Sequence, residues 1–222
     1  MVLQTTARTA IDKKRKKQYP IGMKSSTKTL LIVVAVIAIA ALSVYRFFVG
    51  NYNSIVTYDE AVEASWAQVQ NQYQRRLDLI PNLVATVKGY ASHEQDTFVQ
   101  VTQARAAAES MSGAGVPQSA KEMENFQAAQ NTLTAGVRNL LVVAENYPEL
   151  KANQNFLALQ DQLEGTENRI AVARQDYNKT VQVYNTFIRR FPQSVVANMN
   201  GFEKRPQFSA SQEAQSAPKV EF

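Results

Sequence analysis

The stretch that decides the fold is residues 149–191, ELKANQNFLALQDQLEGTENRIAVARQDYNKTVQVYNTFIRRF. It has no proline and one glycine, and its apolar side chains recur every seven residues, with a second set three residues after the first. Such a pattern is typical of a helix that packs along its whole length. As one helix the stretch would measure about 65 Å. The first set is Phe156, Leu163, Ile170, Tyr177, Tyr184 and Phe191, and the second is Leu159, Thr166, Ala173, Thr180 and Phe187.

Two earlier stretches carry the same seven-residue pattern. They are residues 54–112 and residues 119–146, separated by the loop-forming sequence SGAGVP. Pro81 lies inside the first stretch and predicts a kink or break near residues 79–80, because proline removes a backbone hydrogen bond and clashes with the preceding turn. Ser119 and Glu122 have the spacing of a capping box, which marks the start of the second helix.

These patterns predict an all-α fold, an up-and-down bundle of three to four long antiparallel helices preceded by one transmembrane helix. The number of helices depends on the effect of Pro81, and residues 193–200 are expected to add one short helical turn. The predicted division is a basic cytoplasmic segment at 1–28, a transmembrane helix at 29–49, a helical bundle at 52–200, and an extended or disordered tail at 201–222.

Charge and cysteine content narrow the functional classes. The chain has a formal net charge of +5 and no cysteine, so disulfides are excluded. Eight basic residues and Asp12 give residues 1–28 a charge of +7, which leaves −2 for the rest. The body therefore lacks the basic face that phosphate contacts require, and we expect no nucleic-acid partner.

Residues 29–45, TLLIVVAVIAIAALSVY, contain no charge, proline or glycine, and Phe47 to Val49 extend this apolar run past Arg46. Roughly 20 apolar residues are enough to cross the hydrocarbon layer. The basic residues precede the run, which predicts a cytoplasmic N-terminus and a body across the membrane. Two other interpretations are a cleaved signal peptide, for which the run is long, and a buried core helix. Met23 is an alternative start, with residues 1–22 as an upstream extension.

The sequence contains no recognisable catalytic or metal-binding set. His93 is the single histidine, and no glycine-rich phosphate loop occurs. A metal site would need several convergent ligands, and a di-metal bundle would need two Glu-x-x-His motifs. We therefore expect no catalytic residue, no cofactor and no metal.

Polar residues do occur at or beside the apolar stripes. Because a charge in a helical seam costs several kcal/mol unless it is paired, we expect Arg76 and Glu94 to pair with Glu167 and Arg174 or with neighbouring Asn and Tyr side chains. Such pairs would set the register of the helices; a ligand pocket and a catalytic role are the alternatives. The predicted structural polar cluster comprises Arg76, Glu94, Glu167, Asn168, Arg174, Tyr177 and Asn178.

Small residues on the last long helix admit a close neighbour. Thr166, Ala173 and Thr180 lie on the seam, and Gly165 adds room beside them. The interpretations are packing within the chain and a face for self-association between copies.

Long motifs resemble the LemA family over about residues 30–208. They are QRRLDLIPNLV at 74–84, VKGYA at 87–91, ENYPELKAN at 145–153, QDQLEGTENRI at 160–170, DYN at 176–178 and RRFP at 189–192. The resemblance implies one N-terminal transmembrane helix and a helical bundle on the outer side of the bacterial cytoplasmic membrane. It implies no enzymatic activity. Relatives encoded near membrane-bound peptidases, and a magnetosome branch, suggest assembly or adaptor work in membranes.

We therefore expect a non-enzymatic, membrane-anchored scaffold or adaptor of the bacterial cell envelope. Its expected partners are the lipid bilayer, further copies in a homo-oligomer, and other membrane proteins such as a membrane peptidase. The alternative is a binding or sensing module with a polar pocket between helices for a peptide or small ligand.

Overall fold

The computed structural model describes residues 25–209, which form six helices and no strand. The predicted all-α class is confirmed. Residues up to Arg46 and residues from Phe47 form two compact units.

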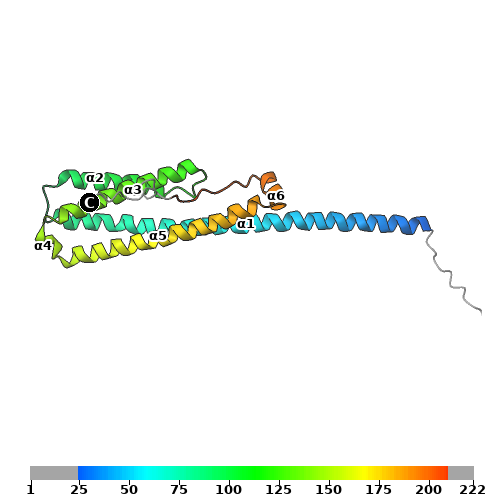
Figure 1. Ribbon diagram of the computed structural model, residues 1–222, viewed down its shortest axis with the longest axis horizontal. Coiled ribbons are helices and arrows are strands. Elements are labelled where there is room, and N and C mark those ends of the chain that lie inside the picture. The colour runs from blue at the N-terminus through cyan, green and yellow to red at the C-terminus, as the bar shows by residue number, and fades with distance from the viewer. Residues whose placement is uncertain (1–24, 210–222) are drawn as a thin grey trace, which may run out of the picture. The chain divides into compact units, whose positions relative to one another are not determined.

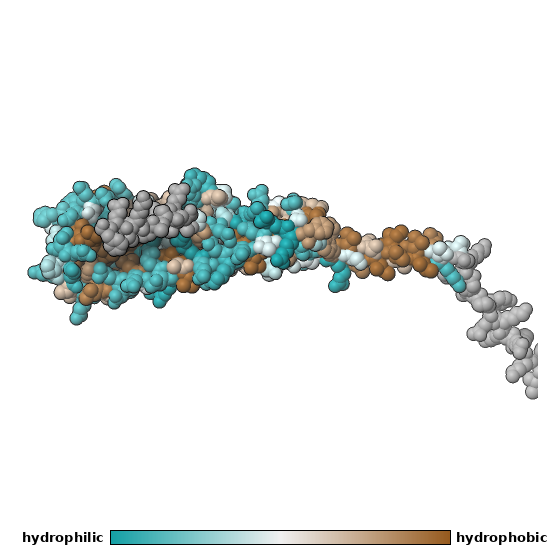
Figure 2. Space-filling view, viewed as in Figure 1, coloured by the Kyte–Doolittle hydropathy of each residue, from teal (hydrophilic) through white to brown (hydrophobic). Residues whose placement is uncertain are grey.

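The first helix, α1 (Ser25–Lys88), carries the apolar segment. Leu30, Ile37 and Leu42 are among the exposed side chains of this segment, which is apolar all round. Figure 2 shows it as a brown stretch of α1. An all-round apolar helix surface is suited to lipid. Within the described part of the chain, α1 is the one helix long and apolar enough to span a membrane.

Four long helical segments run up and down in the second unit, as Figure 1 shows. They are residues 47–88 of α1, α2 (Gln95–Ser112), α3 (Ala120–Ala144) and α5 (Gln154–Arg189). The short helices α4 (Pro148–Lys151) and α6 (Gln193–Met199) precede and follow α5. The N-terminus of α3 has the expected cap, because the Ser119 hydroxyl oxygen accepts from the Glu122 N–H at 3.2 Å.

Of the kink or break expected near residues 79–80, the break is wrong, since α1 continues through Pro81 to Lys88. Proline leaves the carbonyl of residue i−4 without its helical donor. Here that carbonyl belongs to Leu77, and it accepts a hydrogen bond from Nε of Arg105 on α2 at 3.1 Å. A side chain from the neighbouring helix thus replaces the missing N–H. The chain reverses later, at residues 89–94, which divide the expected 54–112 helix into α1 and α2.

The prediction of a single helix over residues 149–191 is also wrong at its N-terminal end, where two helices are found. Residues 152–153 separate α4 from α5, because the Asn153 side chain accepts from the N–H groups of Asn155 and Phe156 at 2.9 and 3.1 Å. This cap starts α5 one turn after α4. The stripe of α5 is buried as predicted from Phe156 to Tyr184, whereas Phe191 lies beyond α5 and is 83% exposed.

The core of the bundle consists of two apolar clusters. One contains Trp66, whose ring centroid lies 5.1 Å from that of Phe126 and 5.2 Å from that of Tyr177. The other contains Leu77 and Leu133. Beside this second cluster α2 and α3 approach closely, because the buried Gly136 leaves space that a Cβ would fill 3.5 Å from Cγ2 of Val101.

Candidate functional site

A layer of buried polar side chains lies between the two clusters. On α1, α3 and α5 the core residues before and after this layer belong to different clusters. The three polar residues classed as buried in the described region are Arg76 on α1, Gln130 on α3 and Thr166 on α5. One helix-to-helix polar layer therefore interrupts an otherwise apolar core.

Arg76 is the centre of this layer and is 3% exposed. Its Nη1 donates to Oε1 of Glu167 at 2.8 Å and to Oγ1 of Thr134 at 3.0 Å. Its Nη2 donates to the side-chain and main-chain oxygens of Gln130. The guanidinium carbon also lies 5.1 Å from the ring centroid of Tyr73, within cation–π range. One side chain on α1 thus contacts both α3 and α5.

Glu167 differs from Arg76 in its surroundings, because it is 46% exposed. The salt bridge is therefore half solvated on its acidic side. Water can take the place of this carboxylate, whereas Gln130, Thr134 and the Tyr73 ring are the neighbours of the guanidinium inside the bundle. The Nε of Arg76 is buried without a hydrogen-bond partner in the described region.

The other residues of the predicted polar cluster make no direct hydrogen bond or ion pair with Arg76 or Glu167 in the described region, although Arg174 interacts with Tyr73, whose ring also lies against Arg76. Glu94 is the N-cap residue of α2 and makes no side-chain cap hydrogen bond, because the reversal at 89–94 removes it from α1. Asn168 is exposed and borders a groove between α1 and α5. Arg174, Tyr177 and Asn178 belong to a second polar system, formed with the C-terminal segment.

This C-terminal segment, residues 202–209, has no regular secondary structure and lies along α5. The Tyr184 hydroxyl donates to the Glu203 carbonyl at 3.1 Å. The Asn185 side chain accepts from the Arg205 N–H at 2.9 Å and donates to the Arg205 carbonyl at 2.9 Å. The amide of Asn185 thus pairs with extended backbone as a neighbouring β-strand would.

The same arrangement occurs seven residues earlier on α5. The Tyr177 hydroxyl donates to the Pro206 carbonyl at 3.0 Å, and the Asn178 amide pairs with the N–H and carbonyl of Phe208 at 2.9 and 3.0 Å. Seven helical residues rise about 10.5 Å, and three extended residues span about 10 Å. Two Tyr-Asn pairs one heptad apart therefore match backbone groups three residues apart.

Two side chains of the segment provide further contacts. Arg205 forms a bidentate pair with Asp59, with Nη2 2.9 and 3.0 Å from the two carboxylate oxygens, and it also donates to Gln118. Phe208 is buried, with its ring centroid 5.5 Å from that of Tyr177, and the Arg174 guanidinium lies 4.6 Å from its ring centroid. The segment thus joins α1, α5 and the loop before α3.

The repeated Tyr-Asn pair was the sequence signal for this contact. The pairs at 177–178 and 184–185 stand out on the seam, but the segment that they bind has no helical period. The part of the expected extended or disordered tail that the structure describes, 201–209, is extended and docked; residues 210–222 lie outside the described residues.

Burial keeps both tyrosines of these pairs protonated. It raises the pKa of Tyr177 and that of Tyr184 from 10.0 to about 12, in spite of the nearby Arg205 charge, which lowers them. Because the pKa is raised in the folded chain, the stabilisation is fully present below pH 10 and is lost as the pH rises through about 12.

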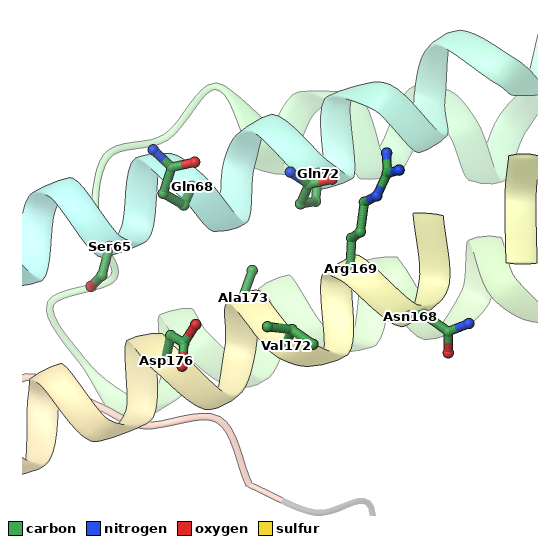
Figure 3. A pocket seen from close by; sticks show the side chains of 8 residues that line it. All are labelled: Ser65, Gln68, Gln72, Asn168, Arg169, Val172, Ala173 and Asp176. Carbon is green, nitrogen blue, oxygen red and sulfur yellow. The ribbon is translucent and has the colours of Figure 1, made fainter. Parts of the chain in front are cut away.

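Two grooves follow α5 on different sides. The α3–α5 groove has a volume of about 630 Å³ and is lined by both polar and apolar residues, among them Arg76, Arg138, Gln160 and Glu167. The α1–α5 groove has a volume of about 430 Å³, and Figure 3 shows its lining, with Arg169 extending from α5 toward α1. Among residues 25–209, no three His, Asp or Glu side chains are placed to hold a metal ion.

Comparison with known proteins agrees with the fold. The LemA family model matches residues 65–222, which include most of the bundle and the docked segment. The chain belongs to the LemA family.

The relatives of this LemA family member include magnetosome proteins and a protein named LemA. Magnetosome protein MamQ 2 of Paramagnetospirillum magneticum is 27% identical over 196 residues, covering 79% of this chain and 72% of the relative. Magnetosome protein MamQ of Magnetospirillum gryphiswaldense is 25% identical, with 78% and 71% covered. Protein LemA of Metamycoplasma hominis is 22% identical, with 84% and 80% covered. The family and the apolar α1 segment together support a single-pass, membrane-associated protein.

The Arg76 layer predicts an asymmetric response to substitution. Arg76→Ala removes a buried stem and leaves the buried Oε1 of Gln130 without its donor, so we expect it to lower the free energy of unfolding by about 3 kcal/mol. Glu167→Ala should cost about 1 kcal/mol or less, because water replaces its half-exposed carboxylate. Urea unfolding of the full chain in detergent, followed by circular dichroism, measures both. Lys121→Ala, in an exposed ion pair with Glu124, is the control. Equal losses of unfolding free energy for Arg76→Ala and Glu167→Ala would contradict the central role of Arg76 in this layer.

The Tyr-Asn pairs predict a local effect on the C-terminal segment. Asn178→Ala and Asn185→Ala each remove two hydrogen bonds to its backbone, so amide exchange at Phe208 and Arg205 should quicken by about tenfold or more. Hydrogen–deuterium exchange of the full chain measures this change. Asn168→Ala, on the same helix but away from the segment, should leave the exchange unaltered. Unchanged exchange in both test variants would show that the amide pairs do not hold the segment.

Proposed function

We propose that this LemA family protein is a non-enzymatic scaffold or adaptor of the bacterial cell envelope, which holds a second copy of itself or another membrane protein through its helical bundle. The observation that supports the proposal is the α1–α5 groove. Its floor contains Val172, which is 56% exposed, and the small Ala173. Exposed apolar side chains in a groove between helices are typical of surfaces that receive a partner helix.

The rim of the groove suits a specific partner. Ser65, Gln68 and Gln72 on α1 are uncharged, so covering them does not desolvate a charge. Arg169 and Asp176 on α5 carry opposite charges, which can set the register of a helix laid along the groove. Gly165 lies on the same helix, and a Cβ at this position would meet no atom within 4 Å. This surface is therefore open to close approach.

The proposed location is the bacterial cytoplasmic membrane, with residues 1–28 inside the cell and the bundle outside. The support is the excess of basic residues before the apolar segment, since such residues remain on the cytoplasmic side. Two of the three relatives described above are named magnetosome proteins, and a role in organising proteins on a membrane fits that name.

A second candidate function is a binding module for an anionic peptide or small ligand in the α3–α5 groove. The supporting observation is that two arginines line this groove, the buried Arg76 and the exposed Arg138. Arginine is suited to planar carboxylate groups. Glu164 and Glu167 on the opposite side oppose an anion, which makes this candidate secondary.

The scaffold proposal predicts cross-linking through the α1–α5 groove. The chain has no cysteine, so Val172→Cys introduces a single reactive thiol. We expect bifunctional thiol reagents to convert most of this variant to dimer in membranes or to join it to another protein. Val142→Cys on α3, where the native side chain is equally exposed at 56%, is the matched control. Equal and low cross-linking of the two variants would overturn the proposed role of this groove.

The binding-module candidate predicts a different result. A library of acidic peptides should include one that raises the thermal midpoint of the full chain, since a ligand stabilises the state that binds it. Arg138→Ala should remove that shift, whereas Arg169→Ala, outside the α3–α5 groove, should retain it. A library without any stabilising member, or a shift that Arg138→Ala retains, would contradict this candidate.

A further inference from the structure

The helix α6 exposes apolar side chains on one face. Phe191, just before α6, is 83% exposed, and Met199, its last residue, is 71% exposed. Val195 lies midway between them and is also exposed. Val195 and Met199 are four residues apart and therefore lie along one side of α6, and Phe191 adds a third exposed apolar side chain just before the N-cap residue Pro192. Such exposure of large apolar side chains is costly in water and indicates a surface that is covered.

Two segments near this face contain no charged residue. Residues 191–202 and residues 47–58 contain no Asp, Glu, Lys, Arg or His. Arg189 and Arg190 immediately precede the first of these blocks and are exposed. A charge-free block bordered by arginines is the composition expected where a protein meets lipid headgroups.

Contacts within the second unit place α6 beside the end of the apolar segment of α1. The Phe202 N–H donates to the Ala197 carbonyl of α6 at 3.0 Å, and the Phe202 ring centroid lies 5.8 Å from that of Tyr52. Tyr52 follows Val49, the last residue of the predicted transmembrane segment, by three residues, or about 4.5 Å of helical rise. The headgroup layer on each side of a bilayer is about 5–7 Å thick. Within the second unit, α6 is therefore linked through Phe202 to a residue that follows the apolar segment by less than one helical turn.

We infer that α6 is a second membrane contact of this protein. Its exposed face, formed by Phe191, Val195 and Met199, inserts into the interfacial layer of the bilayer on the side of the bundle. The two other apolar side chains of α6, Val196 and Ala197, remain in the protein core. Arg189 and Arg190 then lie near the lipid phosphates, which accept hydrogen bonds from guanidinium groups.

A lipid surface fits this face better than a second protein chain. Phe191 and two side chains of a seven-residue helix cannot supply the roughly 800 Å² per partner that a stable protein interface buries. A bilayer needs no matching shape, and the charge-free residues 47–58 continue directly from the apolar segment. This inference does not depend on the proposed scaffold function, which concerns the α1–α5 groove.

The absence of cysteine allows a direct test with single-cysteine variants. Phe191→Cys and Met199→Cys would each carry an environment-sensitive fluorophore, with the full chain in vesicles of phosphatidylcholine and phosphatidylglycerol. Val99→Cys on α2, another exposed apolar position, is the matched control. Lipids with a nitroxide just below the headgroup should quench the labels at 191 and 199 at least about twofold more than the label at 99. Circular dichroism confirms that each variant folds.

Two results would overturn the inference. The first is equal quenching at 191, 199 and 99. The second is a label at 191 that lipid nitroxides do not quench and that becomes shielded from solvent as the protein-to-lipid ratio rises. This result would assign the face to a second copy of the chain. Quenching of both α6 labels that is independent of this ratio supports the lipid contact, whatever the outcome of cross-linking at Val172.

Discussion

The bundle depends on one buried guanidinium group. Arg76 lies where the core would otherwise be continuous, and it reaches α3 through Gln130 and α5 through Glu167. A buried charge is stable only where its partners are correctly placed, so any slip of α3 or α5 along α1 would leave it unpaired. The apolar clusters on either side supply the non-directional driving force, while Arg76 makes one alignment of the helices better than its neighbours.

Side chains replace missing backbone partners at two other places. Arg105 on α2 donates to the Leu77 carbonyl that Pro81 leaves free, so α1 passes through a proline without ending. Asn178 and Asn185 pair with the backbone of residues 208 and 205, so an extended segment is held without a sheet. In both cases a polar side chain from a distant element satisfies a backbone group that would otherwise be unpaired.

The surfaces of the protein have separate proposed roles. The apolar part of α1 supports membrane association, and the proposed α6 contact would bind the adjoining interfacial layer. The α1–α5 groove lies farther along the bundle and is the proposed site for a partner helix. The docked C-terminal segment joins α1 to the loop before α3, because Arg205 contacts both Asp59 and Gln118.

The sequence by itself determined the helical class, the apolar segment long enough to span a membrane, the buried stripe of α5 and the identity of several unusual polar residues. These features are local, because a period of seven and a run of apolar residues are visible within one element. Only the tertiary structure decided that α1 passes through Pro81, that Arg76 lies between two clusters, and that the segment after Gly201 is docked rather than free. Each of these depends on partners tens of residues away, such as Arg105 for Leu77 and Asn178 for Phe208, and no periodicity in one stretch reveals which distant group will satisfy it.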